Sequence, residues 1–287
     1  MLEGLGSKLS YFRKEKGLSM KELADGLCDY TTIYRVEKGK QLPRLEILNE
    51  ICMKLEIPFQ SLFPFNEEVV RLKKLCREFT YNEDYLSLEI TLENCGELLK
   101  KISSTYTYKE FRKFILMHRA VLLHKRDNNA IKALNILRPL VKVNNAVSEL
   151  DFGILNSIGL INLSQNNYES AYKIYHAIYQ KIKLRNIIED PTLIPRVGYN
   201  YANSLFKLKK YEDSLQIIQE VHYYLETQQS IYLLGETFHM VAVLSKKLGS
   251  QKEAEEAIKN AILVFSLTKN EVNLTKSKAF LSNLQAK

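Results

Sequence analysis

The side chains best suited to chemistry near the start of the chain are hydroxyl, phenol and guanidinium groups between positions 30 and 40. Threonine can contact base edges, and arginine can pair with guanine through two hydrogen bonds. Lysines flanking such a segment can contact phosphates. The candidate base contacts are Tyr30, Thr31, Thr32 and Arg35, and the flanking cations are Lys8, Arg13, Lys21, Lys38 and Lys40. For each cation taken singly, an ordinary solvated helix surface is the alternative.

A second group of candidates consists of side-chain amides in the later part of the chain. An asparagine donates and accepts hydrogen bonds at once, so it can bind a peptide backbone whatever side chains the peptide carries. The candidates on the first helices of predicted helix pairs are Asn156, Asn162, Asn200, Asn203 and His239, with Tyr199 and Phe238 as apolar contacts. Taken singly, these amides could equally be exposed or cap helices.

Catalytic and metal chemistry are not predicted. The five histidines are scattered, and the chain contains no phosphate-binding glycine loop, GxSxG elbow or HExxH motif. Cys28, Cys52, Cys76 and Cys95 form no CxxC pair and match no zinc spacing. We expect the cysteines to fill apolar sites in a reducing compartment. The sequence therefore predicts no catalytic residue, no metal and no cofactor.

Composition limits the possible classes of protein. The 287 residues are 46% hydrophobic and 26% charged, with only 11 Gly and 6 Pro, which favours a helical globular chain. The net charge of +8 permits nucleic-acid binding, but residues 1–64 carry 10 Lys or Arg against 9 Asp or Glu. No apolar run is long enough to cross a membrane, and the charged N-terminus is not a signal peptide. We expect a cytoplasmic protein without membrane contact.

The N-terminal elements follow from helix signals. Apolar residues at helical spacing from Leu5 onward predict a first helix that ends at Gly17. Ser19, with Glu22 three residues later, is a capping box that starts a second helix over 20–27.

Asp29 is the expected N-cap of a third helix over 30–37, which Gly39 ends. Apolar residues predict a further helix over 45–55, stopped by Pro58. Short helices in such close succession, within about 60 residues, are the architecture of a helix-turn-helix domain.

The later part of the chain contains an internal repeat. Three segments, 159–175, 202–218 and 242–258, share one frame, at offsets of 43 and 40 residues. In each, a small residue is followed nine positions later by the start of a second helix and three positions further by another small residue. These frame positions are Gly159, Ala202 and Ala242, then Tyr168, Tyr211 and Gln251, then Ala171, Ser214 and Ala254. Such hairpins stack into a solenoid because neither helix can bury its face alone. The pattern resembles tetratricopeptide repeats, and the alternative is a generic helical bundle.

The stretch LSMKELADGLCDYTTIYRVEKGKQLPRLEILNEICMKLEI is similar to the Cro/repressor-type helix-turn-helix. The shared marks are the Leu-Ser start, Glu22-Leu23-Ala24, and Arg35-Val36-Glu37 before Gly39. This resemblance implies an all-α chain in which residues 1–57 bind DNA and the third helix enters the major groove. Residues 58–66 are the predicted linker, and 67–287 form a right-handed tetratricopeptide-like solenoid for peptide binding and dimerisation.

The combination resembles the peptide-responsive regulators of Gram-positive bacteria, the group of Rap, Rgg, NprR, PlcR and PrgX. LGSKLSYFRKEKGLSMKEL, the turn with Cys28, ILNEICMKLEIPF and YNYANSLFKLKKYEDSL are similar to the PlcR subgroup. The resemblance implies a homodimeric quorum-sensing transcription factor, an activator, that binds operator DNA and a short signalling peptide. It also implies that Asn200, in the setting Tyr199-Asn200-Tyr201-Ala202, holds the peptide backbone.

Two alternatives remain open from the sequence. The solenoid could bind a protein partner in place of a peptide, or the chain could be a phage-type regulator built from the same parts. Enzymatic activity is a third reading, and the absence of catalytic motifs weighs against it.

Overall fold

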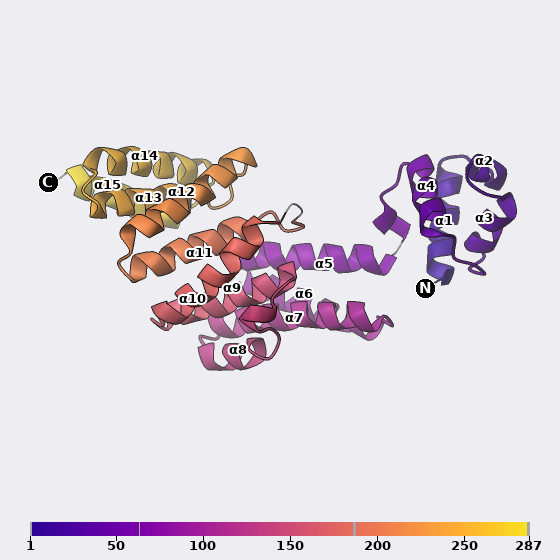
Figure 1. The fold of residues 1–287 in the computed structure, drawn as a ribbon, viewed down its shortest axis with the longest axis horizontal. Helices are drawn as coiled ribbons and strands as arrows, with labels where there is room; N and C mark the ends of the chain where they lie inside the picture. Colours follow the sequence, from indigo (N-terminus) through magenta and orange to yellow (C-terminus); the bar gives the residue numbers. More distant parts are fainter. Residues whose placement is uncertain (1, 63, 186–187, 286–287) are drawn as a thin grey trace. The chain divides into compact units, whose positions relative to one another are not determined.

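The computed structural model describes residues 2–62, 64–185 and 188–285, and every regular element in these ranges is helical (Figure 1). The described chain divides into two compact units, Met1–Ile115 and Leu116–Lys287. The elements are α1 (Leu2–Glu15), α2 (Met20–Ala24), α3 (Tyr30–Glu37), α4 (Leu45–Leu55), the 3-10 helix η1 (Phe59–Leu62), α5 (Pro64–Tyr81), α6 (Tyr85–Lys100), α7 (Thr105–Lys125), α8 (Ala130–Leu137), the 3-10 helix η2 (Val143–Asn145), α9 (Glu149–Ser164), α10 (Tyr168–Lys183), α11 (Leu193–Lys207), α12 (Tyr211–Thr227), α13 (Leu234–Lys247), α14 (Gln251–Leu267) and α15 (Glu271–Gln285).

The helix signals of the N-terminal segment are confirmed with one correction. The Ser19 hydroxyl accepts from the Glu22 amide, the Glu22 carboxylate accepts from the Ser19 amide, and Asp29 caps α3. The second helix ends at Ala24 instead of continuing to residue 27, because Gly26 takes a left-handed conformation at φ 76°. The segment therefore holds four α-helices and one 3-10 helix.

The core of these helices is a cluster of aliphatic side chains that includes Leu5, Leu9, Leu23, Ile33 and Val36. Leu45, the first residue of α4, is 68% exposed and lies outside this core. Burying these side chains is the dominant favourable term in the stability of the domain.

The first half of the predicted linker is packed and not free. Residues 59–62 form η1, and Leu62 is fully buried in the core of the N-terminal helices. Residue 63 lies outside the described residues. Pro64 begins α5, in agreement with the preference of proline for a first helical position.

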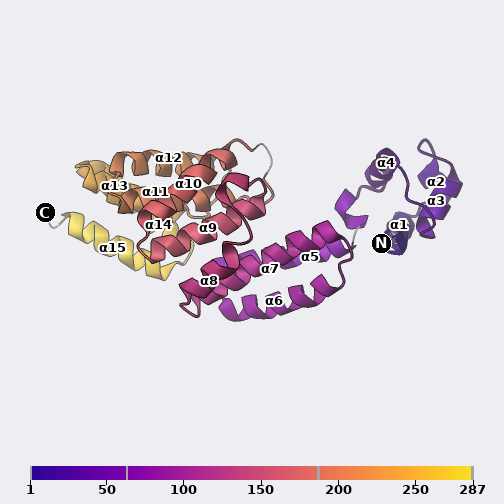
Figure 2. The ribbon, with the colours of Figure 1, turned by 60° about the horizontal axis from the view of Figure 1, so that its bottom comes forward.

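The later helices form a series of antiparallel hairpins, α5–α6, α7–α8, α9–α10, α11–α12 and α13–α14, followed by α15 (Figure 2). Within the described residues, every one of these hairpins has a left-handed residue two positions before its second helix begins. These residues are Glu83, Asn128, Asn166, Lys209 and Gly249, at φ of 56°, 49°, 61°, 62° and 88°. One turn geometry is therefore repeated along the chain.

The predicted repeat frame is confirmed. Tyr168, Tyr211 and Gln251 are the first residues of α10, α12 and α14. Tyr85 begins α6 in the same way, nine residues after Cys76 and three before Leu88.

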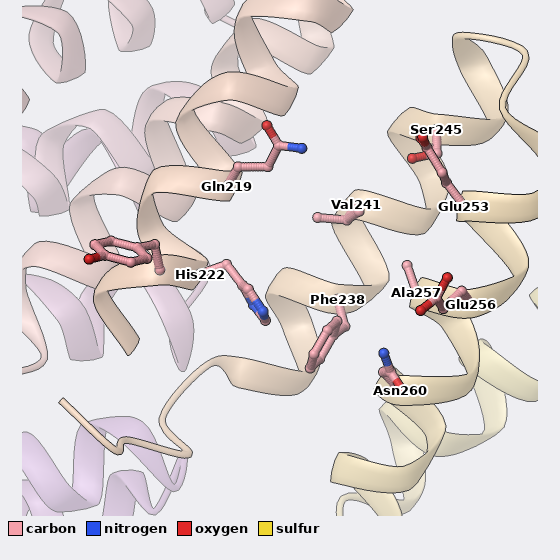
Figure 3. A pocket seen from close by; sticks show the side chains of 10 residues that line it. Gln219, His222, Phe238, Val241, Ser245, Glu253, Glu256, Ala257 and Asn260 are labelled. Carbon is pink, nitrogen blue, oxygen red and sulfur yellow. The ribbon is translucent and has the colours of Figure 1, made fainter. Parts of the chain in front are cut away.

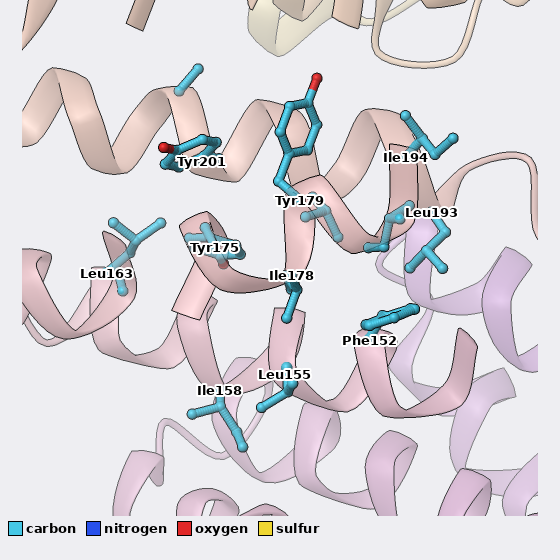
Figure 4. Close-up of a cluster of buried hydrophobic side chains, with 14 of the residues drawn as sticks. Phe152, Leu155, Ile158, Leu163, Tyr175, Ile178, Tyr179, Leu193, Ile194 and Tyr201 are labelled. Carbon is cyan, nitrogen blue, oxygen red and sulfur yellow. The ribbon is translucent and has the colours of Figure 1, made fainter. Parts of the chain in front are cut away.

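The small residues of the frame allow the helices to approach closely. A Cβ atom on Gly159 would lie 2.5 Å from Cζ of Tyr175, which is fully buried. In the next hairpin the hydroxyl of Ser214 donates to the carbonyl of Ala202 at 2.7 Å. Side chains of α9, α10 and α11, among them Phe152 and Tyr179, fill the space between these helices (Figure 4).

Candidate DNA-binding and peptide-binding surfaces

The exposed face of α3 carries the residues predicted to contact bases. Ile33 and Val36 point into the core, so the opposite side of the helix presents Tyr30, Thr31 and Arg35, with Thr32 half-buried at its edge. Tyr34, which was not among the predicted base contacts, is 43% exposed beside Arg35. Lys21, Lys38 and Lys40 are exposed as predicted. The structure therefore places one phenol-, hydroxyl- and guanidinium-bearing face on a single helix.

Two contacts organise the N-terminal end of this face. The hydroxyl of Thr31 donates to Oδ1 of Asp29 at 2.5 Å, and this hydrogen bond lowers the pKa of Asp29. Nζ of Lys21 lies 5.8 Å from the ring centroid of Tyr30, so α2 and α3 contribute jointly to the face.

The prediction of Arg13 as a phosphate contact is corrected. Its guanidinium is buried and binds both oxygens of the Glu37 carboxylate, at 2.5 and 3.0 Å, and donates to the Leu18 carbonyl at 2.7 Å. These bonds raise the pKa of Arg13 above its ordinary value. Arg13 joins α1 to the end of α3. Its place four residues after Leu9, on the buried side of α1, was the signal for this role.

Lys8, another predicted flanking cation, forms an ion pair with Glu67 on α5 at 3.1 Å. It is partly exposed, so the pair is weak in water.

The second candidate surface, which we call the first-helix face, is formed by α9, α11, α13 and α15. Across its first two helices, Nδ2 of Asn200 donates to Oδ1 of Asn156 at 3.0 Å. Asn156 is 7% exposed and Asn200 is half-buried, so one amide supports the other. Asn203 lies one turn further along α11 and is partly exposed.

A half-buried carboxylate that was not among the predicted site residues continues this face. Oε1 of Glu236 on α13 accepts a hydrogen bond from Nδ2 of Asn273 on α15 at 3.3 Å. Burial raises the pKa of Glu236. Burial and the charge of Glu236 raise the pKa of Tyr199 on α11 to about 12, so this phenol stays protonated and can donate a hydrogen bond.

His239 also lies on this face. Its Nδ1 is 2.8 Å from the hydroxyl of Ser277 on α15, and its ring lies 5.8 Å from that of Phe280. Burial and the neighbouring Lys276 lower the pKa of His239.

This lowered pKa makes the stability of the repeat domain depend on pH. Protonation is less favourable in the folded chain than in the unfolded one, so the contribution is complete above about pH 6.5 and declines as the pH falls toward the folded-state pKa. We expect the melting temperature of the wild type to fall more between pH 7 and pH 5.5 than that of H239Q. Parallel curves for the two proteins would contradict this expectation. The raised pKa of Glu236 acts in the opposite direction in both proteins and cancels in the comparison.

Two predicted peptide contacts lie elsewhere. The amide of Asn162 is buried and donates to the Ile158 carbonyl at 2.9 Å. Asn162 lies one turn after Gly159, on the side of α9 that packs against α10. Phe238 contacts His222 of α12, with ring centroids 4.4 Å apart, so it belongs to the opposite side of α13. Neither is a contact on the first-helix face.

Within residues 2–62, 64–185 and 188–285, no three His, Cys, Asp or Glu side chains gather closely enough to hold a metal ion. No helix in the described part of the chain is long and apolar enough to span a bilayer. Cys52, Cys76 and Cys95 are buried as expected, and Cys28 is partly buried.

The fold and the two surfaces define a helix-turn-helix regulator that carries a helical repeat domain. The model of the helix-turn-helix family matches residues 9–62, and the model of the RNPP family C-terminal domain matches residues 82–281. The chain belongs to the RNPP family, and it is a DNA-binding regulator and not an enzyme. The predicted resemblance and the all-helical fold class are thereby confirmed.

Solved structures of similar fold agree with this assignment. PlcR of Bacillus thuringiensis, in complex with the peptide PapR7 and DNA, superposes with a TM-score of 0.80 at 21% identity, over 99% of this chain and 100% of that one. Rgg2 of Streptococcus dysgalactiae gives 0.65 at 16% identity, over 97% and 99%. ComR of S. thermophilus, in complex with DNA and its signalling peptide ComS, gives 0.63 at 16% identity, over 98% and 99%. A search of curated proteins finds no match.

Proposed function

We propose that this protein is a homodimeric, cytoplasmic transcription activator that binds operator DNA through α3 and a short signalling peptide on the first-helix face. In this proposal residues 1–57 bind DNA, residues 58–66 connect, and residues 67–287 bind the peptide and dimerise. The peptide would be a quorum-sensing signal.

The observation that carries the proposal is the Asn156–Asn200 amide pair on neighbouring first helices, in a chain of the RNPP family. The amide of Asn200 uses one of its two N–H donors on Asn156, and its own carbonyl oxygen has capacity to accept. It can therefore donate to and accept from an extended peptide backbone. PlcR and ComR have been crystallised with both DNA and a peptide, which supports the same pair of ligands here.

The regulatory step follows from linkage. A dimer recognises two half-sites whose spacing matches the distance between its two DNA-binding domains. A peptide shifts the dimer toward the DNA-binding state only by its greater affinity for that state. In this proposal, a peptide that binds both states equally leaves the affinity for DNA unchanged.

Arg35 provides the test of the DNA interface. We expect R35A to weaken binding to a selected operator by roughly 5- to 150-fold, the equivalent of about 1–3 kcal/mol for one bidentate base contact. K38A should weaken binding less, uniformly across sequences, and reduce the salt slope by about 1. The operator is selected from random DNA with the wild-type protein, and affinities are measured by fluorescence anisotropy at several salt concentrations.

R71A is the matched control, because Arg71 is an exposed arginine on α5 outside the α3 face. If R35A and R71A bind the selected operator equally well, α3 does not read bases in the proposed way.

Asn200 provides the test of the peptide site. Peptides derived from small open reading frames beside the gene are screened against the full-length protein by native mass spectrometry, and calorimetry gives the affinity of each one that binds. We expect N200A to lose at least about tenfold in affinity, because a peptide amide and carbonyl would lose their partner.

N283A serves as the control, since Asn283 is exposed on α15. Unfolding of N200A is followed in parallel, because Asn156 loses a hydrogen bond in this variant. Failure of every peptide to bind, in a protein that still binds DNA as a dimer, would favour a protein partner for the repeat domain. Equal binding by N200A and N283A would remove Asn200 from the site.

A further inference from the structure

A pocket of about 310 Å³ opens on the side of the repeat domain formed by the second helices (Figure 3). It lies between α12 and α14, with α13 as its floor, away from the residues of α13 that contact α15. Its lining includes His222, Phe238, Val241, Ser245, Glu253 and Glu256. It is separate from the first-helix face, and its interpretation does not depend on the proposed peptide.

One polar group in this pocket lacks a partner. Ser245 is 1% exposed, and its hydroxyl has no hydrogen-bond partner among the described residues. Leaving a buried hydroxyl without a partner is unfavourable, so a ligand that hydrogen-bonds to it gains a favourable contact.

The preceding repeat shows what this space holds when it is filled. Positions in α11 and α13 correspond at an offset of 40 residues, so Val241 corresponds to Tyr201 and Ser245 to Leu205. Ala257 on α14 likewise corresponds to Ile217 on α12. At each of these positions the pocket has the smaller side chain.

In the preceding repeat, Tyr201 is 6% exposed, and its ring packs against Tyr172 and Tyr179 of α10. Its hydroxyl lies 2.8 Å from Nδ1 of His176, and its ring centroid is 5.6 Å from that of Tyr179. The pocket between α12 and α14 therefore lies where a neighbouring repeat holds a phenol ring of its own. Phe238 occupies the position that corresponds to Gly198 in the preceding repeat, and its ring packs against that of His222.

The charges of the two sites also differ. In the filled site, Lys183 forms an ion pair with Glu220 at 2.6 Å, and Lys210 lies 4.6 Å from the ring centroid of Tyr172. Lys183 on α10 corresponds to Glu226 on α12 at the 43-residue offset, and Lys210 corresponds to Ser250 at the 40-residue offset, so neither cation has a counterpart.

Two further carboxylates, Glu253 and Glu256, lie on the rim of the pocket. Relative to its neighbour, the site therefore lacks the phenol ring of Tyr201 and both cations, and its rim carries two carboxylates.

We propose that this pocket binds a tyrosine-sized aromatic ring linked to a cation, with the ring over Val241, a polar group at Ser245 and the cation at the glutamate rim. The same chemistry occurs in a free arylalkylamine and in a tyrosine next to a lysine in a polypeptide.

The probes are tyramine and the capped dipeptide acetyl-Tyr-Lys-amide, titrated into the full-length protein and followed through the methyl NMR signals of Val241. We expect saturable shifts with both probes, and the tighter of the two identifies the source of the ligand. Absence of saturable shifts with both probes overturns the proposal.

A filled variant tests the location. V241Y/S245L copies the side chains of the preceding repeat, and we expect it to bind tyramine at least about tenfold more weakly than wild type while melting at the same or a higher temperature. V272Y, which adds a tyrosine at an exposed position of α15, should bind like wild type. Should the double variant fail to fold, S245L alone is compared in the same way. Equal binding by the filled variant and the wild type refutes the assigned location.

The charge requirement has its own measurement. E253Q/E256Q should weaken tyramine binding several-fold and leave binding of the uncharged analogue 4-methylphenol unchanged. An equal loss for both compounds contradicts the role given to the carboxylates.

Discussion

Replacing Arg13 with alanine should destabilise the N-terminal helices by about 3–5 kcal/mol, because it leaves the carboxylate of Glu37 buried without its partner. The side chains of Arg13 and Glu37 are only 8% and 4% exposed. The loss is therefore that of a buried pair and not of a surface ion pair. Loss of the bond to Leu18 adds to it, since that carbonyl closes the turn between α1 and α2. The measurement is hydrogen exchange of the amides of α2 and α3 in the full-length protein.

Two variants make this prediction specific. K100A removes one partner of an exposed pair with Glu97, whose side chains are 72% and 70% exposed, and should change stability by less than about 1 kcal/mol. R13M/E37L removes both charges together and should recover most of the stability that R13A loses. If R13A exchanges as slowly as K100A, the buried pair does not hold α1 on α3.

Replacing Gly6 with alanine should have a comparable effect at the same contact between α1 and α3. A Cβ atom on Gly6 would lie 2.4 Å from the carbonyl oxygen of Val36 and 2.6 Å from that of Glu37. Both are backbone atoms, so neither can rotate away as a side chain would. We expect a loss at or above the upper end of the roughly 1–3 kcal/mol that overpacking costs.

Gly96 is the matched control, because a Cβ atom at this position in α6 meets nothing within 4 Å. Alanine is the better helix former, so G96A should gain roughly 0.5–1 kcal/mol. Urea unfolding of the two variants should therefore move in opposite directions. A G6A protein as stable as G96A would show that α1 does not approach α3 as closely as described.

The elements that the sequence predicted best are those fixed by local signals. The residues of α3 were predicted to their ends, because Asp29 and Gly39 have local roles as cap and stop. The first residues of α10 and α12 followed from the repeated spacing of Tyr168 and Tyr211. In both cases the determining interaction lies within a few residues of the position it fixes.

Contacts between distant parts of the chain were harder to predict. Arg13 pairs with a residue 24 positions away, and no local pattern in the sequence identifies that partner. Phe238 was predicted as an apolar peptide contact because it lies on the first helix of a predicted pair. Which side of that helix packs on α12 depends on tertiary contacts, and these place Phe238 against α12. Glu236 was not predicted, because a single glutamate in a charged chain gives no sign that tertiary packing will partly bury it.

The left-handed residue shared by the hairpin turns has a consequence for how the repeat domain moves. Each turn ties a second helix to the first helix that precedes it, so most loops that close during folding are short and cost little entropy. Such domains open one hairpin at a time, and the free energy of opening differs along the chain. A ligand that spans Asn156 and Asn200 joins two hairpins that otherwise open separately. Its binding would therefore be recorded first as slower opening of α9–α12, while α15 at the end of the array would continue to fray.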